Sequence, residues 1–391
     1  MKRGKDIAIL LLFVGCMLLI NFFKSYNNLD VEGDGFIYLT FSKYYLLMGQ
    51  SKLRTPLIAI FLIPDVHWAR VEMMFFHLGI SILIYALCMR YTESRRASLI
   101  AALLYGCNWW FVQFTTYTLM ELPSVFALLF SLYLLPKKNI AAGVLQGFMF
   151  LLKPHYFFFI LASLLMIKDR KARSKFILSF LIIAVFLEVL LDFVFYTPHT
   201  SRFVYSPWEF FHYNIIVGED PILLSYKRNL SFSFIISRIM NGNPLTESIL
   251  RWFLSPLVPL ASLILSIKLK RLFTSKFMLA ITFLYIIFNL AVLVSYSYEE
   301  FRPDKVVIPK TWNITSNYAS MVSFYTGEGC CSFSDTLDAT LSTLNRCKYL
   351  VLVKHPNRLA FYNEVKKYAE ENFILIDSYR EGIEIEVYEN K

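Results

Sequence analysis

Long apolar stretches dominate the first three hundred residues of this chain, and short polar segments separate them. A helix needs roughly 20 mostly apolar residues to cross the hydrocarbon layer of a membrane, and several of the stretches reach or approach that length. We therefore expect about nine membrane-spanning helices. The predicted spans are 7–23, 69–90, 97–113, 119–135, 139–152, 155–167, 175–196, 249–267 and 274–298.

The fifth and sixth stretches are short, and Lys153-Pro154 lies between them. Proline interrupts a helix because it lacks the backbone N–H and clashes with the preceding turn. Two interpretations therefore stay open for residues 139–167: two short spans, or one broken hairpin.

Three polar segments lie outside the predicted spans on the same side: 24–68, 197–248 and everything after Tyr298. In the first, residues 36–48 mix apolar and polar positions in a pattern typical of a helix lying at the membrane surface. The many aromatic residues of the second segment also favour an interfacial location.

From Pro303 the pattern changes to that of a soluble domain of about ninety residues. Short apolar runs alternate with amphipathic segments, which predicts a small α/β domain. The predicted strands are 305–308, 349–353, 373–379 and 383–388, the last two forming a hairpin, and the predicted helices are 316–326, 335–346 and 358–372.

Composition and charge agree with a membrane protein, because 57% of the residues are hydrophobic and only 17% are charged. Lys and Arg of short loops accumulate on the cytoplasmic side of membranes, and here they occupy every alternate loop if all nine stretches cross. The N-terminus is then cytoplasmic and the C-terminal domain extracytoplasmic. The net charge of +10 reflects this orientation and contact with anionic lipid, so nucleic-acid binding is not indicated. The basic residues of these inside segments are Lys2, Arg3, Lys5, Arg90, Arg95, Arg96, Lys137, Lys138, Lys168, Arg170, Lys171, Arg173, Lys175, Lys268, Lys270, Arg271 and Lys276.

These patterns predict a polytopic α-helical membrane domain over residues 1–302 and a small extracytoplasmic α/β domain over residues 303–391. No cofactor is expected, because the chain has no Gly-rich phosphate loop. Cys and His show no metal-ligand spacing, so no metal site is expected either. Among the external cysteines, one bridge to Cys347 from Cys330 or Cys331 is open, with an odd thiol left over.

Four short motifs occur in order along the membrane domain, and we expect them to face the external side. The motifs are Asp34-Gly35-Phe36-Ile37-Tyr38 with Gly49 and Pro56-Leu57 after it, Met120-Glu121-Leu122-Pro123, the glycine-containing segment 142–153 that ends in Lys153, and Tyr298-Glu299-Glu300-Phe301-Arg302.

In this order and placement the chain resembles the GT-C superfamily of integral membrane glycosyltransferases. The likeness is to the branch related to protein mannosyltransferases and to the aminoarabinose transferase of lipid A. In that branch the first external loop begins with a pattern like DExxY, to which Asp34 and Tyr38 correspond. Gly35 stands where the family has its second acidic residue, with Glu32 nearby as a substitute.

The resemblance implies transfer of a sugar from a polyprenyl or dolichyl phosphate to a hydroxyl of a protein, lipid or glycan acceptor at the extracytoplasmic face of the cell membrane. A carboxylate must accept the proton of the acceptor hydroxyl, and cations must neutralise the phosphate leaving group. The candidate catalytic residues are Asp34, as the base, and Glu121; the candidate phosphate-binding residues are Lys153, Arg202, Lys227, Arg228 and Arg302; and the candidate substrate-binding residues are Tyr38 and Glu300.

Each of these residues also has a simpler interpretation. Asp34 could be a solvated carboxylate, and Glu121 could only stabilise the N-terminus of its helix. Lys153 could extend from a hairpin tip to water, and Arg302 could simply follow the last span at the membrane surface.

A different class of function is indicated by Glu188 and Asp192, whose spacing puts two carboxylates on one face of the seventh span. Such a pair is typical of an ion-coupled transporter or a lipid-carrier flippase. The chain lacks the internal repeat that transporters usually show. A non-catalytic accessory subunit is the third interpretation, in which Asp34 is dispensable.

Overall fold

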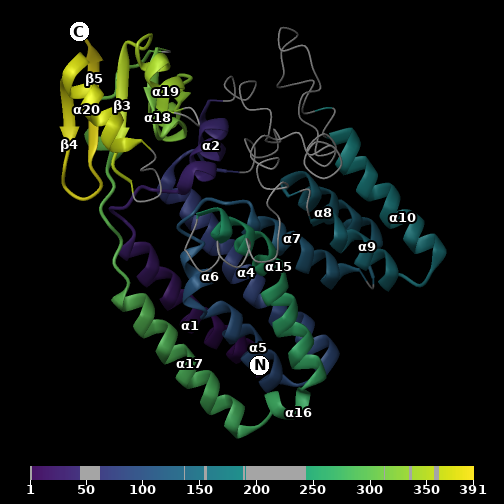
Figure 1. The fold of residues 1–391 in the computed structure, drawn as a ribbon. Coiled ribbons are helices and arrows are strands. Elements are labelled where there is room, and N and C mark those ends of the chain that lie inside the picture. Colours follow the sequence, from purple (N-terminus) through teal and green to yellow (C-terminus); the bar gives the residue numbers. More distant parts are fainter. Residues whose placement is uncertain are drawn as a thin grey trace.

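The computed structural model of this chain describes residues 2–44, 62–135, 137–153, 156–187, 190, 244–311, 313–333, 337–355 and 361–391. A bundle of helices is followed by a small mixed sheet with its own helices (Figure 1). The N-terminus lies at one end of the bundle, and the C-terminal domain lies at the opposite end (Figure 1).

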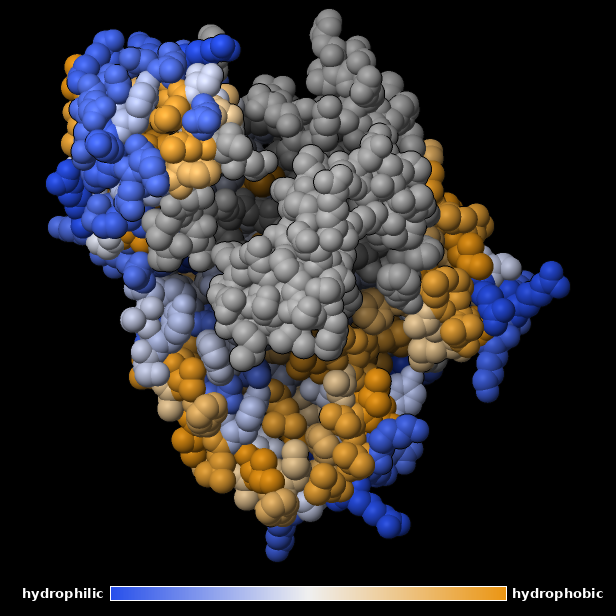
Figure 2. All heavy atoms as spheres, viewed as in Figure 1, coloured by the Kyte–Doolittle hydropathy of each residue, from blue (hydrophilic) through white to orange (hydrophobic). Residues whose placement is uncertain are grey.

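Three of the described helices are long and apolar enough to cross a membrane: α1 (Lys2–Lys24), α4 (Val66–Thr92) and α17 (Lys276–Ser295). Large apolar side chains cover the outer surface of the bundle, whereas hydrophilic residues cover much of the C-terminal domain (Figure 2). The chain therefore has helices suited to membrane association, although nine spans are not confirmed. The shorter apolar helices are α7 (Glu121–Leu134), α8 (Asn139–Leu152) and the part of α15 (Pro244–Lys268) from Leu254 onward.

The predicted span 97–113 is divided into two short helices, α5 (Arg95–Gly106) and α6 (Trp109–Gln113). Asn108 separates them, because its side-chain oxygen accepts hydrogen bonds from the backbone N–H groups of Trp110 and Phe111 and so starts a new helix. Its amide nitrogen donates to the hydroxyl of Tyr285 on α17, at 2.7 Å. The sequence prediction of one continuous helix was wrong at this point, since asparagine side-chain capping competes with helix continuation.

The end of the bundle that carries the N-terminus also gathers basic side chains. Arg95 contacts Asp6 of α1 through two hydrogen bonds, of 2.6 and 2.8 Å, and Arg90 stacks over the ring of Tyr133 at the end of α7. The short helix α16 (Lys270–Phe273) lies at the same end (Figure 1). The predicted basic loops of residues 90–96 and 268–276 therefore share one end with the N-terminus.

Helices α9 (Phe157–Met166) and α10 (Arg170–Leu181) follow α8, and a π-helical segment, Ile182–Leu187, extends α10. Two glycines of α8 lie against α10. A Cβ at Gly143 would be 2.4 Å from the carbonyl oxygen of Phe176, and a Cβ at Gly147 would be 2.6 Å from Ile183. The glycines are spaced four residues apart and let the two helices approach closely.

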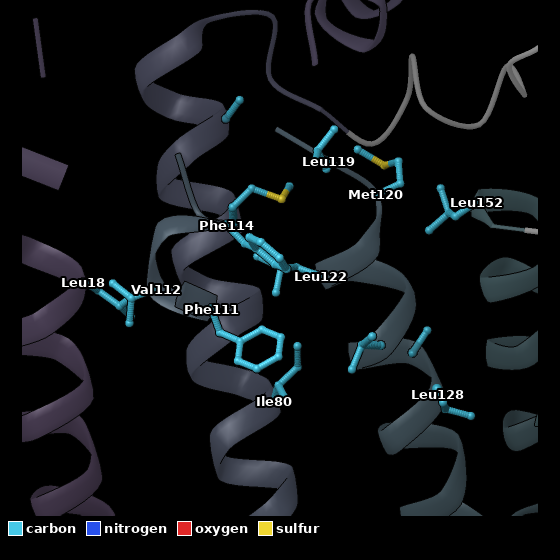
Figure 3. Packing of buried hydrophobic residues seen from close by; sticks show 14 of the residues in the cluster. Leu18, Ile80, Phe111, Val112, Phe114, Leu119, Met120, Leu122, Leu128 and Leu152 are labelled. Atoms are coloured by element: carbon cyan, nitrogen blue, oxygen red, sulfur yellow. The ribbon is translucent and has the colours of Figure 1, made fainter. Parts of the chain in front are cut away.

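The hydrophobic core of the bundle lies where α1, α4, α6 and α7 meet. Leu18, Ile80, Val112 and Leu122 come from these four helices and point toward the same interior (Figure 3). All four side chains are buried. This core holds the start of α7 in a fixed position.

The C-terminal domain is a five-stranded sheet of order β2-β1-β3-β5-β4. Strands β1, β2 and β3 are parallel, and β3, β5 and β4 are antiparallel. The predicted strand 349–353, the hairpin and the three helices are confirmed, with boundaries shifted by a few residues. The strands are β1 (Ile314–Ser316), β2 (Cys331–Ser332), β3 (Tyr349–Val353), β4 (Phe373–Tyr379) and β5 (Ile385–Asn390), and the helices are α18 (Ala319–Thr326), α19 (Leu337–Leu344) and α20 (Tyr362–Asn372).

One expectation about this domain was wrong, and one alternative that the sequence left open is decided by the structure. The predicted strand 305–308 is not present. Residues 303–305 form a 3₁₀ turn, Val307 is 74% exposed, and the first strand of the sheet begins later, at Ile314. The thiols of Cys330, Cys331 and Cys347 are all free, so the bridge left open by the sequence does not form in the structure.

The predicted surface helix, 36–48, overlaps α2 (Glu32–Lys43), while residues 45–48 lie outside the described residues; protein covers some of the apolar side chains of α2. Phe36 and Leu39 are fully buried, and the Phe36 ring contacts the rings of Tyr318 and Phe324 in the C-terminal domain. Helix α2 therefore packs against α18 (Figure 1). The expected membrane-surface location was wrong for this face of the helix, because tertiary contact buries the same amphipathic pattern.

Candidate functional site

A buried ion pair lies at the start of α7. The ammonium nitrogen of Lys153 is 2.8 Å from Oε1 of Glu121, and the two residues are only 6% and 2% exposed. The other carboxylate oxygen, Oε2 of Glu121, is buried and has no hydrogen-bond partner among the described residues. A buried carboxylate oxygen without a partner is costly, and such groups are concentrated at functional sites.

The helical hairpin of α7 and α8 produces this pair. Glu121 is the first residue of α7, and Lys153 directly follows the last residue of α8, so the antiparallel helices bring them together. Met120 and Leu152, the residues before them, are buried in the core seen in Figure 3. Lys153 is therefore paired inside the protein, and the interpretation that it extends from a hairpin tip to water was wrong.

The first turn of α2 packs on the residues that precede Glu121 in the sequence. A Cβ at Gly35 would be 2.7 Å from the hydroxyl of Thr118, three residues before Glu121. Asp34, next to Gly35, belongs to the same first turn, although its side chain lies outside the described part of the molecule. The contact also gives a physical reason for glycine at position 35, since the second acidic side chain of the DExxY pattern does not fit against Thr118.

Two further candidate residues, Glu300 and Arg302, lie at the end of the membrane domain. Glu300 contacts the turn between β4 and β5. The carbonyl oxygen of Glu300 accepts a hydrogen bond from the N–H of Ile383, and Gly382, with φ of 85°, packs on that carbonyl. Arg302 makes two hydrogen bonds with Asp304, of 2.8 and 2.9 Å. This pairing raises the pKa of Arg302 and lowers the pKa of Asp304. Arg302 is thus held by a carboxylate of its own segment.

Tyr38 lies one turn after Asp34 on α2, and its side chain is buried. The remaining candidates, Arg202, Lys227 and Arg228, lie outside the described residues. Glu188 and Asp192, on which the transporter interpretation rests, also lie outside them.

Sequence reasoning missed two charged residues that organise this end of the bundle. Arg70 of α4 is 1% exposed and donates to the carbonyl oxygens of Ser25, Asp30 and Thr116 at 2.8, 2.8 and 3.1 Å. The carboxylate of Asp30 accepts a hydrogen bond from the hydroxyl of Tyr318. A single arginine at the edge of an apolar stretch was the available signal, because an unpaired buried guanidinium is not stable.

This arrangement can position a hydroxyl compound and an anion. Oε2 of Glu121 can accept a proton or a hydrogen bond, while the ammonium of Lys153 provides positive charge in a site with little water. Among the described residues, no group of three or more His, Cys, Asp or Glu side chains is arranged to hold a metal ion. Comparisons with protein-family models, with curated proteins and with solved structures find no match to this chain.

Proposed function

We propose that this chain is a membrane glycosyltransferase of the GT-C type. It transfers a sugar from a polyprenyl or dolichyl phosphate to a hydroxyl of a protein, lipid or glycan. The observation that carries the proposal is the contact between Gly35 and Thr118, which packs the first turn of α2 against the segment that leads into Glu121 and its buried ion pair with Lys153. The order of motifs along the chain supports it further.

In the proposed reaction Asp34 accepts the proton of the acceptor hydroxyl. The acceptor oxygen forms a bond to the anomeric carbon while the bond from that carbon to the phosphate oxygen breaks. The electron pair of the broken bond stays on the phosphate, which leaves as the polyprenyl phosphate. One displacement by one base inverts the configuration at the anomeric carbon.

Charge neutralisation of the leaving phosphate is the second requirement. The ammonium of Lys153 is buried beside Glu121, so an incoming phosphate competes with that carboxylate for the same cation. Oε2 of Glu121 is oriented by the same ion pair and is available for a sugar or acceptor hydroxyl. We assign Tyr38, one turn after Asp34 on α2, to substrate contact.

The test supplies the purified protein with a panel of labelled polyprenyl-phosphate sugars and measures transfer to hydroxyl acceptors. Asp34→Asn should lower the rate at least about 100-fold, since general base catalysis contributes about that much or more. Asp65→Asn is the matched control, because Asp65 is an exposed carboxylate before α4 and asparagine can replace it as the helix cap. Equal rates for Asp34→Asn and wild type would remove Asp34 from the mechanism, and no transfer from the whole panel would contradict the proposed function.

A further inference from the structure

One carboxylate of the bundle, Asp30, contacts two residues of the C-terminal domain. Its Oδ1 accepts a hydrogen bond of 2.6 Å from the hydroxyl of Tyr318, and its Oδ2 lies 2.9 Å from Nε2 of His355. Both partners belong to the C-terminal domain, about three hundred residues away in sequence. The side chains of Asp30 and His355 are nearly buried, so water screens this contact only weakly.

The main chain of the same residue is held by the bundle. Arg70 donates 2.8 Å hydrogen bonds to the carbonyl oxygens of Asp30 and Ser25, and it also contacts the carbonyl of Thr116. The turn that contains Thr116 continues to Thr118, against which Gly35 packs. Asp30 is therefore held by the bundle through its backbone and by the C-terminal domain through its side chain.

Helix α2 begins two residues after Asp30, at Glu32, and has no capping side chain of its own. Val31 occupies the N-cap position and makes no side-chain hydrogen bond. A helix without a cap is free to fray at its first turn. Its position then depends on tertiary contacts, which here are the bonds of Asp30 and the packing of Phe36 on Tyr318.

We propose that Asp30, His355, Tyr318 and Arg70 form a junction through which the C-terminal domain holds the first turn of α2 in place. Asp30 and His355 are then positioning residues for Asp34, which lies four residues after Asp30. The domain contributes to the site by fixing its geometry, without touching substrate. The positioning of Asp34 for the reaction rests on the proposed function. The role of the junction in holding α2 does not.

Hydrogen–deuterium exchange of the full-length protein tests the junction without any activity. His355→Ala should speed exchange in residues 31–43 by at least about tenfold, while exchange in α4 stays unchanged. His355→Gln should restore much of the protection, because its amide nitrogen can donate to Asp30. Lys354→Gln is the matched control, since it removes a neighbouring exposed ion pair with Glu384. Unchanged exchange in His355→Ala would overturn the proposal.

Tyr318→Phe is a milder variant in case the histidine variants fold poorly, because it removes only the hydroxyl and keeps the ring packed on Phe36. It should also speed exchange in residues 31–43, and protection equal to wild type in that variant would count against the junction.

The same variants are then compared in the sugar-transfer assay. A positioning role predicts a lower kcat for His355→Ala, a KM for the lipid donor within about twofold of wild type, and recovery of kcat in His355→Gln. Faster exchange in α2 with an unchanged kcat would overturn the positioning role. If the wild-type protein transfers no sugar, the proposed function fails, and the exchange result still decides whether the junction exists.

Discussion

At the residue scale, the Glu121–Lys153 pair dominates the energetics of the candidate site. Each charge loses its water on burial, and the attraction at 2.8 Å offsets that cost only while both partners are present. Removing one partner leaves an uncompensated buried charge. When both charged side chains are replaced, uncharged side chains of similar volume can fill the space.

We predict that Lys153→Met lowers the free energy of unfolding by about 3–5 kcal/mol. The double variant Glu121→Gln/Lys153→Met should recover most of that loss, because Glu121 then no longer leaves a buried negative charge without its cation. Thermal unfolding of the purified proteins in detergent measures both effects. A double variant as unstable as Lys153→Met would show that the pair is not coupled as the geometry indicates.

The stabilisation that the Arg302–Asp304 pair provides should depend on pH. Its hydrogen bonds lower the pKa of Asp304 below the ordinary value of 3.8, so the stabilisation is present above that pH and is lost as pH falls through the lowered pKa. Because the pair is partly exposed, its contribution is at most about 1 kcal/mol.

Asp304→Asn should therefore speed hydrogen exchange around residues 302–306 at pH 7. After correction for the intrinsic exchange rate, its difference from wild type should shrink as pH falls through the lowered pKa of Asp304. A difference that persists at the acidic end would assign the effect to packing instead of charge.

At the element scale, close contact between α8 and α10 depends on two glycines. Ser179 and the carbonyl of Phe176 occupy the space that a side chain at position 143 would need. The carbonyl belongs to the helix backbone, so it cannot move aside as a flexible side chain can. The sequence motif around Gly143 and Gly147 thus acts through helix packing, beside any likeness to the glycine-containing hairpin of the GT-C family.

Gly143→Leu should force the two helices apart and lower stability by about 1–3 kcal/mol, the usual cost of overpacking. Gly15→Leu on α1 is the control, because nothing lies within 4 Å of a Cβ there. In that variant the higher helix propensity of leucine should leave stability unchanged or slightly raised. Thermal unfolding compares the two, and equal melting temperatures for both variants would contradict the packing seen between α8 and α10.

At the scale of the whole molecule, the basic loops of residues 90–96 and 268–276 lie at the opposite end of the bundle from the C-terminal domain (Figure 1). Basic loops are retained on the cytoplasmic side, so we expect the domain to be extracytoplasmic. Cys331 is an exposed thiol of that domain. Burial raises the pKa of the neighbouring Cys330 thiol, which makes Cys331 the more reactive of the two.

A membrane-impermeant maleimide should therefore label Cys331 in intact cells, and Cys331→Ser should abolish that signal. A cysteine introduced by Lys270→Cys in the Cys331→Ser background should react only after the membrane is permeabilised. Labelling of position 270 in intact cells, together with protection of Cys331, would reverse the topology and contradict the proposed extracytoplasmic site.

Much of the local structure could be predicted from the sequence, because it depends on neighbouring residues. The apolar stretches that became α1, α4 and α17 have the length of a span, and Tyr349–Val353 has the pattern of a buried strand. Predictions failed where residues far apart in the sequence determine the local structure. Asn108 divides a stretch that looks continuous, and the N–H of Val307 donates to the carboxylate of Asp377 on β4 instead of to a strand backbone.

For the candidate site, too, some features could be predicted from the sequence and others depend on the tertiary structure. The sequence by itself determined that the chain has long apolar helices and a separate C-terminal domain, since periodicity and length are local properties. It also pointed to Asp34, Glu121 and Lys153 as chemistry-bearing residues. Only the tertiary structure decided that Glu121 pairs with Lys153, that Gly35 packs on Thr118, and that Asp30 joins the bundle to the C-terminal domain. Those contacts depend on how helices far apart in sequence meet, and no spacing along the chain encodes them.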